Sequence, residues 1–171
     1  MKSFFASAKL RLLLLPALLS TAGLLTTACS KGEDATPTQT YTDEELFQSF
    51  LTSNKITNAK KQPSGLYYIP RTTDSTAVRA TAGKTVSVLY TGALMNGTVF
   101  DASSLHGNTP FSFVLGKGQV IAGWDEGIAL MHKGDKAVLL IPSTLGYGAQ
   151  AVGSIPANSP LYFEVQLTDV K

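Results

Sequence analysis

The chain has 171 residues, of which 44% are apolar and 15% are charged, a composition that suits one globular domain with extensions and a sizeable core. The formal net charge is +2, but Lys2, Lys9 and Arg11 lie in a predicted leader. Without these three, 11 basic residues face 12 acidic ones and the net charge is −1. This balance argues against a nucleic acid as partner, because such proteins carry excess positive charge.

Residues 1–28 have the pattern of a signal peptide for export. A basic segment, MKSFFASAKLR, precedes an apolar run that ends in small residues before Cys29. A single cysteine cannot form an internal disulfide, so cleavage after Ala28 and lipid attachment to Cys29 is the interpretation that gives this thiol a purpose. The pattern resembles a bacterial lipoprotein signal, although Thr26 stands where an aliphatic residue is common.

Two other interpretations of this leader stay open. One is an uncleaved membrane anchor, because the uncharged stretch from Leu12 to Ala28 is just long enough to span a membrane. The other is an ordinary secreted protein with a stray thiol. All three interpretations predict a domain outside the cytoplasm, and the first predicts one that is lipid-anchored to a bacterial membrane.

Residues 29–41 are predicted to be a flexible tether, because they are polar and without periodicity. A helical extension is predicted over residues 42–62, where Thr42 and Glu45 have the spacing of a capping box. Apolar side chains then recur at helical spacing, at Leu46, Phe47, Phe50 and Leu51. We expect a helix of about two to three turns that packs on the domain or on a second copy of the chain.

From residue 63 onward the sequence changes to strand patterns. GLYYIPR is the first predicted strand, and TVSVLYTG is the second, with Val86, Val88 and Tyr90 on one face. A turn at Asn96-Gly97 leads into TVFD. AVLLIP and LYFEVQLTDV complete the set, and the last strand alternates apolar with polar residues, which predicts one buried and one solvent-exposed face.

One helix is predicted within this region, from about Trp124 to His132, with Trp124, Ile128 and Met131 on one side and Gly134 as its C-terminal cap. The predicted fold class is therefore α+β. We expect a curved antiparallel β-sheet, a half-barrel, wrapped around one short α-helix, with an N-terminal helical extension.

The sequence contains no recognisable set of residues for covalent or cofactor chemistry. His106 and His132 are far apart and have no Cys or Glu at ligand spacing, so we expect no metal site. Nucleophile-elbow, P-loop and dinucleotide motifs are missing, and Gly116-Lys117-Gly118 lacks the rest of a phosphate cradle. The domain is therefore expected to work without a nucleophile and without a cofactor.

Aromatic and branched residues instead recur beside glycines and prolines in a specific order. YTGALMNGTVFDAS, PFSFVLGKGQVIAGWDEGIALMHKGDKAVLLIP, GYGA and IPANSPLYFEVQL resemble the FKBP-type peptidyl-prolyl cis/trans isomerases in order and spacing. The resemblance covers residues 80–171 and implies an isomerase domain over 63–171. The N-terminal helix followed by SGLYYI resembles, more weakly, the lipoprotein or periplasmic members of the family.

The resemblance implies an apolar pocket that binds a proline ring. The catalytic residues that it implies are Tyr90, Phe100, Asp101, Tyr147 and Phe163. The substrate-binding residues that it implies are Phe111, Val120, Ile121, Trp124 and Ile155.

Each implied role differs from what the residue alone would indicate. By the resemblance, Trp124 would lie under the proline ring, the Tyr147 hydroxyl would point at a substrate carbonyl, and the Ile121 amide would hold the next carbonyl. Asp101 would lie at the rim, hydrogen-bonded to Tyr90 or to a ligand. Without the resemblance, Trp124 would be interpreted as a core residue and Asp101 as a turn residue.

Two segments depart from the family pattern. ASSLHGNTP lacks the arginine that many members pair with the aspartate, and His106 lies near Asp101 by accident or as a substitute. The loop QAVGSIPANSP is slightly shortened but retains Ile155. We therefore expect weaker binding of macrolides of the rapamycin type than in typical members.

Three functions remain as hypotheses. The first is a peptidyl-prolyl isomerase that assists folding of exported proteins by twisting X-Pro bonds without covalent chemistry. The second is a non-catalytic proline-peptide-binding or chaperone lipoprotein, and the third is a structural lipoprotein. The complete aromatic set favours the first, because a structural protein has little reason to expose it. The expected partners are proline-containing polypeptides, macrolides and, through a lipid anchor, a membrane.

Overall fold

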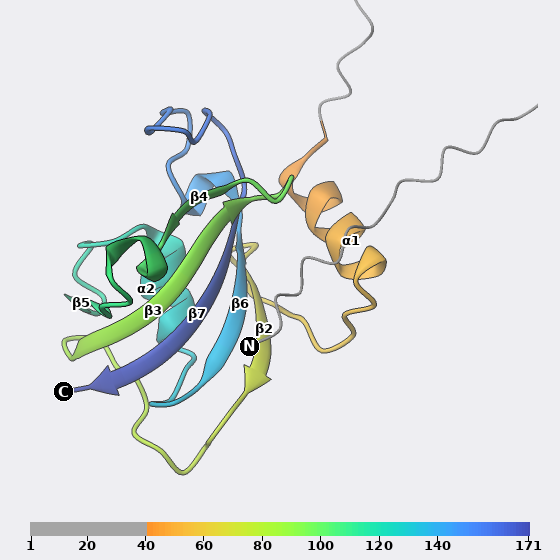
Figure 1. Ribbon diagram of the computed structural model, residues 1–171. Coiled ribbons are helices and arrows are strands. Elements are labelled where there is room, and N and C mark those ends of the chain that lie inside the picture. The colour runs from red at the N-terminus through yellow and green to blue at the C-terminus, as the bar shows by residue number, and fades with distance from the viewer. Residues whose placement is uncertain (1–40) are drawn as a thin grey trace, which may run out of the picture. The chain divides into compact units, whose positions relative to one another are not determined.

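The computed structural model describes residues 41–171 (Figure 1). The predicted signal peptide, Cys29 and all of the predicted tether except its last residue lie outside the described residues. No helix within residues 41–171 is long and apolar enough to cross a membrane.

Within residues 41–171, two α-helices, two short 3-10 helices (η) and seven strands follow one another. Their bounds are α1 Asp43–Ser53, β1 Lys60–Lys61, β2 Tyr67–Thr72, β3 Thr85–Leu94, β4 Val99–Ala102, η1 Ser103–His106, β5 Phe111–Val114, α2 Ala122–Ile128, β6 Lys136–Ile141, η2 Ser143–Leu145 and β7 Leu161–Val170.

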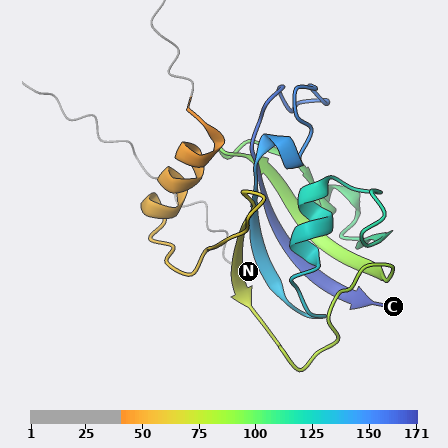
Figure 2. The same ribbon diagram turned by 180° about the vertical axis from the view of Figure 1, so that it is seen from behind.

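The strands form one antiparallel sheet in the order β1-β2-β6-β7-β3-β4, and β5 also pairs with β3. β3 and β7 are the long central pair, which runs from Val86 opposite Val170 to Leu94 opposite Leu161 with a register shift between Ser87 and Val88. The other side of β3 is shared, because β5 pairs with its first half and β4 with its second half. The sheet curves around α2 (Figures 1 and 2), which confirms the predicted α+β class and the half-barrel around one helix.

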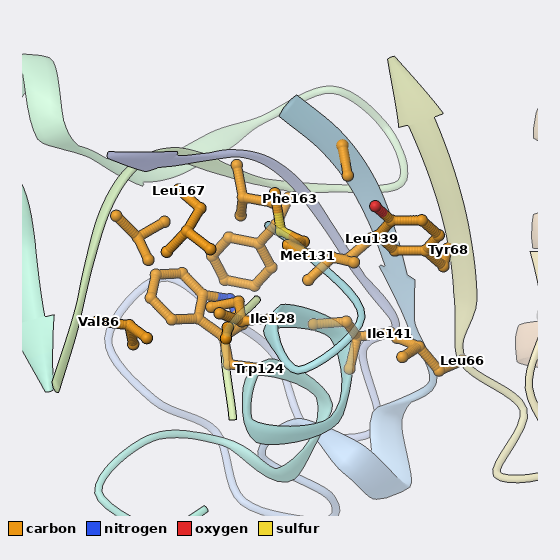
Figure 3. Packing of buried hydrophobic residues seen from close by; sticks show 14 of the residues in the cluster. Leu66, Tyr68, Val86, Trp124, Ile128, Met131, Leu139, Ile141, Phe163 and Leu167 are labelled. Carbon is orange, nitrogen blue, oxygen red and sulfur yellow. The ribbon is translucent and has the colours of Figure 1, made fainter. Parts of the chain in front are cut away.

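The inner core lies between the sheet and α2 (Figure 3), and its buried residues include Val86, Ile128, Met131, Leu139 and Leu167. The predicted alternation in β7 is confirmed, because Leu161, Phe163, Val165 and Leu167 are all buried. α2 approaches the sheet closely at Gly123, where an added Cβ would lie 2.4 Å from the Ile141 side chain. A larger residue at this position would push the helix off the sheet.

The outer core lies on the opposite face of the sheet, under α1. Its buried residues are Phe47, Leu51, Tyr67, Ile69, Val138 and Leu140. The sequence left open whether α1 packs on the domain or on a second copy, and in the structure it packs on the domain. Because β6 is covered on both faces, Ala137 to Ile141 are all buried, which explains the uninterrupted apolar run.

The N-terminus of α1 confirms the predicted capping box. The Thr42 side chain accepts a hydrogen bond from the Glu45 amide at 3.3 Å, and the Glu45 carboxylate accepts one from the Thr42 amide at 2.8 Å. Two backbone N–H groups that a helix leaves without partners are thereby satisfied.

The predicted bounds of the central helix are wrong at both ends. α2 begins at Ala122 and ends at Ile128, rather than running from Trp124 to His132. The chain leaves the helix because its next segment pairs with residues 78–80: the Ala80 amide donates to the Met131 carbonyl, and His132 forms a bridge with Arg79.

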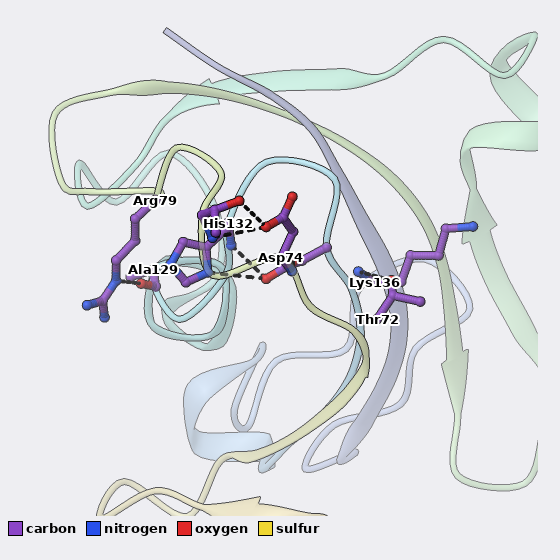
Figure 4. A network of polar contacts seen from close by, with 8 residues as sticks. Thr72, Asp74, Arg79, Ala129, His132 and Lys136 are labelled. Atoms are coloured by element: carbon purple, nitrogen blue, oxygen red, sulfur yellow. Dashed lines mark hydrogen bonds and ion pairs between the residues drawn. The ribbon is translucent and has the colours of Figure 1, made fainter.

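Gly134 is therefore not the helix cap, although its φ is +93°. It lies in the turn before β6, and its amide donates to the Leu167 carbonyl at 2.7 Å. The buried carboxylate of Asp135 holds this turn, because it accepts hydrogen bonds from the Asp74 amide at 2.7 Å and the His132 amide at 2.8 Å (Figure 4).

The remaining strand predictions are confirmed with one correction. Gly97 has a φ of +88° and its amide donates to the Leu94 carbonyl at 2.9 Å, which closes the predicted turn between β3 and β4. The second face of β7 is not solvent-exposed along its whole length. The Tyr162 ring packs edge-on against Phe50 of α1, with ring centroids 5.5 Å apart.

Packing of α1 on its own domain makes Phe47→Ala a direct test of the outer core. Phe47 is 1% exposed, so its truncation should lower the free energy of unfolding by about 3 kcal/mol or more, measured by urea denaturation. The exposed Ser49→Ala on the same helix is the control, with an expected change within about 0.5 kcal/mol. A midpoint that depends on protein concentration, or equal effects of the two variants, would contradict this packing.

Candidate active site

Trp124, in the first turn of α2, is the centre of an aromatic cluster. Its side chain is only 5% exposed. The distances from its ring centroid are 5.2 Å to Tyr90, 5.2 Å to Phe163, 5.9 Å to Phe113 and 6.3 Å to Phe111. Figure 3 shows Trp124 and Phe163 beside one another in the inner core. Within residues 41–171 the buried indole N–H has no hydrogen-bond partner.

The central strands and β4 supply the neighbouring rings. Tyr90 comes from β3, Phe100 from β4 and Phe163 from β7, and the Phe100 and Phe163 rings meet edge-on at 5.5 Å. Gly92 makes this contact possible, because an added Cβ would lie 2.6 Å from Phe163 and 2.7 Å from Phe100. Strands far apart in the sequence thus bring these rings together.

Loops and the start of β5 supply the other predicted site residues. Val120 and Ile121, directly before α2, are half-buried and pack against the inner core, in which Ile155 is also buried. Phe111 at the start of β5 is 46% exposed, and Tyr147 after η2 is 36% exposed. Both rings therefore present aromatic surface to solvent, Phe111 in contact with Trp124, whereas Phe113 is buried in the core.

Asp101 is the centre of a polar network at the edge of the cluster. Its carboxylate accepts hydrogen bonds from the Tyr90 hydroxyl at 2.6 Å and from the Ala102 amide at 2.8 Å, and the His106 Nε2 lies 2.8 Å from its Oδ1. Burial raises the pKa of Asp101, but the hydrogen bonds from Tyr90, His106 and Ala102 outweigh it and leave the pKa lowered. His106 thus contacts Asp101 directly, which answers the question that the missing arginine raised.

The hydrogen bond between Tyr90 and Asp101 also changes the pKa of Tyr90. Burial, followed by the hydrogen bond to the Asp101 carboxylate, raises the pKa of the Tyr90 hydroxyl well above its ordinary range. Tyr90 therefore stays neutral and continues to donate to Asp101 at physiological pH.

Two polar residues that the sequence did not single out also support the cluster. The buried Ser103 hydroxyl accepts a hydrogen bond from the Tyr90 amide at 3.0 Å. The Asp125 carboxylate accepts hydrogen bonds from the Gly116 amide at 2.8 Å and the Gly118 amide at 3.0 Å, and so holds the loop that leads into α2. The contact of Asp125 could have been predicted from the sequence, because an acid in the first turn of a helix favours nearby backbone N–H groups. No neighbouring residue indicates the contact of Ser103.

The cluster offers binding surface rather than reactive groups. Among residues 41–171 no group of three or more His, Cys, Asp and Glu side chains could hold a metal ion. Among the described residues, the polar network around Tyr90 brings together one carboxylate, that of Asp101, and one imidazole, that of His106, and both lie at its edge. What the arrangement can do is take up an apolar ring against Trp124 and contact the adjoining polar groups from the rim.

Comparisons with known proteins agree with this geometry. Residues 76–168 match the profile of the family described as FKBP-type peptidyl-prolyl cis-trans isomerase. The chain is 46% identical over 107 residues to FK506-binding protein 2 of Dictyostelium discoideum, covering 62% of this chain and 77% of that protein. It is 44% identical over 128 residues to FK506-binding protein 2 of Debaryomyces hansenii, covering 74% and 91%. The crystal structure of FkpA from Escherichia coli superposes with a TM-score of 0.67 at 38% identity, covering 75% of this chain and 57% of that one.

The Asp101 network predicts how this carboxyl titrates. Because its native pKa is lowered, its contribution to stability is present above the unfolded pKa of about 4 and is lost as the pH falls through the lower native value. Tyr90→Phe and His106→Ala should each move the midpoint of the Asp101 carboxyl upward, as measured by carboxyl-carbon NMR. Ser104→Ala, on the exposed side of η1, should leave it unchanged. Identical midpoints in all four proteins would show that the network does not control Asp101.

Proposed function

The chain belongs to the FKBP-type peptidyl-prolyl cis-trans isomerase family, and from this premise we propose that it isomerises X-Pro bonds in exported polypeptides while anchored to a bacterial membrane through Cys29. The observation that carries the isomerase site is the buried ring of Trp124, which is surrounded by four aromatic rings.

The reaction requires rotation about a bond with partial double-bond character. The barrier is about 18–20 kcal/mol, and unaided isomerisation takes tens to hundreds of seconds. The planar amide is more dipolar than the twisted one, so a pocket with apolar walls and little water disfavours the ground state relative to the transition state. Trp124 would form the base of this pocket and Phe163 one wall, and no covalent bond to the protein need form.

Hydrogen bonds to the substrate would complete the stabilisation. The Tyr147 hydroxyl has no hydrogen bond to another of the described residues, and it is accessible for a substrate carbonyl. We assign the next carbonyl to the Ile121 amide, at the N-cap position of α2. A donor that reaches its acceptor only in the twisted geometry lowers the barrier, because it stabilises the transition state alone.

Relatives of this chain are named for binding FK506, and we propose that the same pocket accepts macrolides of this kind. The departures at His106 and in the loop around Ala151 support weaker binding than in typical members. Peptide binding depends on the aromatic walls, which are complete, and is expected to be less affected.

Tyr147→Phe should separate catalysis from folding. With one transition-state hydrogen bond lost, kcat/KM for a proline-containing peptide should fall about tenfold, while the free energy of unfolding changes by less than about 0.5 kcal/mol. Trp124→Ala should reduce activity and also cost about 3–5 kcal/mol of stability.

A protease-coupled isomerisation assay and urea denaturation measure the two quantities. Wild-type protein that binds the peptide but gives the uncatalysed rate would favour the proline-binding alternative. Equal losses of stability in the two variants would make Tyr147 a core residue.

Export and anchoring rest on the sequence of the first 41 residues. A basic segment, an apolar run, small residues before the only cysteine and a polar tether together support a lipoprotein whose domain works outside the cytoplasm. A nascent exported chain reaches that compartment unfolded, and its X-Pro bonds then isomerise slowly unless catalysed. An anchored isomerase would act where such chains emerge.

Cys29→Ala tests the anchor. Wild-type protein expressed in a bacterium should partition into detergent, because the several acyl chains of a lipoprotein bind firmly, and Cys29→Ala should move it to the aqueous phase. Mass spectrometry of the mature N-terminus identifies the modification. A free thiol at Cys29 in the mature protein would refute the anchor.

A further inference from the structure

The loop between β6 and β7, residues 142–160, carries Tyr147 and Ile155 of the candidate site. Its first turn is η2, and the Ser143 carbonyl accepts hydrogen bonds from the Gly146 amide at 3.0 Å and the Gly148 amide at 2.8 Å. These two glycines flank Tyr147 directly. The position of Ser143 therefore helps to set where the Tyr147 backbone lies.

Ser143 is in turn held by a residue from the N-terminal helix. The Asp43 carboxylate, at the first position of α1, accepts hydrogen bonds from the Ser143 amide at 2.7 Å and from its hydroxyl at 2.8 Å. Ser143 is only 9% exposed, and hydrogen bonds to a charged acceptor are about twice as strong as neutral ones. The contact joins residues 100 positions apart in the chain.

Asp43 supplies the hydrogen-bond acceptor that the start of η2 lacks. Pro142 occupies the N-cap position, and no side-chain hydrogen bond from this position caps the helix. The Ser143 amide is one of the N–H groups that a helix start leaves without a partner. The carboxylate of α1 therefore caps η2 from another element, and without it the buried amide and hydroxyl of Ser143 would lose their acceptor.

The rest of α1 keeps Asp43 in this position. Phe47 and Leu51 anchor the helix in the outer core, and the Thr42 capping box fixes its first turn. Leu46 faces the far end of the same loop across an open apolar groove, whose lining includes Pro156 and Pro160. The helix therefore lies beside both ends of the loop.

We propose that α1 is a working part of the isomerase site, in which Asp43 is a positioning residue that acts through Ser143 to orient Tyr147. The family profile begins at residue 76, so it does not include this helix. The inference rests on the proposed isomerase function, since it names a further residue on which that function depends.

The test compares two neighbouring substitutions in the full-length protein. Asp43→Ala should lower kcat/KM about three- to tenfold, because a small displacement of a catalytic group costs rate. Glu44→Ala is the matched control: it removes the neighbouring carboxylate of the same helical turn, which accepts hydrogen bonds from the Tyr67 hydroxyl and the Gln48 side chain. Because this carboxylate does not contact Ser143, kcat/KM should stay at the wild-type value where the protein is folded.

A second measurement distinguishes positioning from general destabilisation. If Asp43 acts through Tyr147, adding Asp43→Ala to Tyr147→Phe should lower kcat/KM by less than twofold further, because the group it positions is already gone. Ser143→Ala, which removes one of the two hydrogen bonds, should give a smaller loss with the same dependence on Tyr147, and it carries the test should Asp43→Ala fail to fold.

Several results would overturn the inference. These are wild-type activity in folded Asp43→Ala and Ser143→Ala, an equal loss in Glu44→Ala, or the same fold-loss with and without the Tyr147 hydroxyl. A wild-type protein that gives only the uncatalysed rate would instead refute the isomerase function, and this role with it.

Discussion

The close approach of α2 to the concave face of the sheet is the constraint on which the rest of the structure depends. Gly123 lets the helix lie against Ile141, and this places the next residue, Trp124, among the buried side chains of the inner core. Rings from β3, β5 and β7 then pack around the indole. The contacts that stabilise the fold thus also hold the aromatic cluster of the candidate site, and we expect large substitutions there to affect folding and binding together.

Polar interactions are arranged around this apolar centre rather than within it. The rings that contact Trp124 are uncharged, and the raised pKa of Tyr90 keeps its hydroxyl protonated beside the Asp101 carboxylate. A carboxylate with three hydrogen bonds can remain at the edge of an apolar site, because each bond offsets part of its desolvation. This separation suits a reaction that needs low polarity at the rotating bond and fixed donors at its border.

Local signals in the sequence predicted the features that local interactions determine. The capping box at Thr42, the turn at Gly97 and the alternation in β7 each depend on residues a few positions apart, and the structure confirms them. The predicted end of α2 was wrong because Met131 and His132 pair with residues 78–80, and no residue close in sequence indicates that pairing. For the site, the family resemblance carried by the order of aromatic residues implied a cluster around Trp124, while the contacts of Ser103 and Asp125 needed the fold to bring the partners together.

The role of α1 follows from the same distinction between local and distant interactions. Its amphipathic pattern predicted a helix with a buried face, but an acid at its first position has an ordinary local explanation, since acids favour helix N-termini. Only the sheet brings Ser143 to that carboxylate. Outer-core packing fixes the helix on β2 and β6. The chain continues from β6 into η2, and Asp43 of the helix binds Ser143 in η2 by hydrogen bonds. The helix α1 is therefore linked to the loop of Tyr147 in two ways. Its apolar face packs on the strand that leads into the loop, and Asp43 binds Ser143 within the loop.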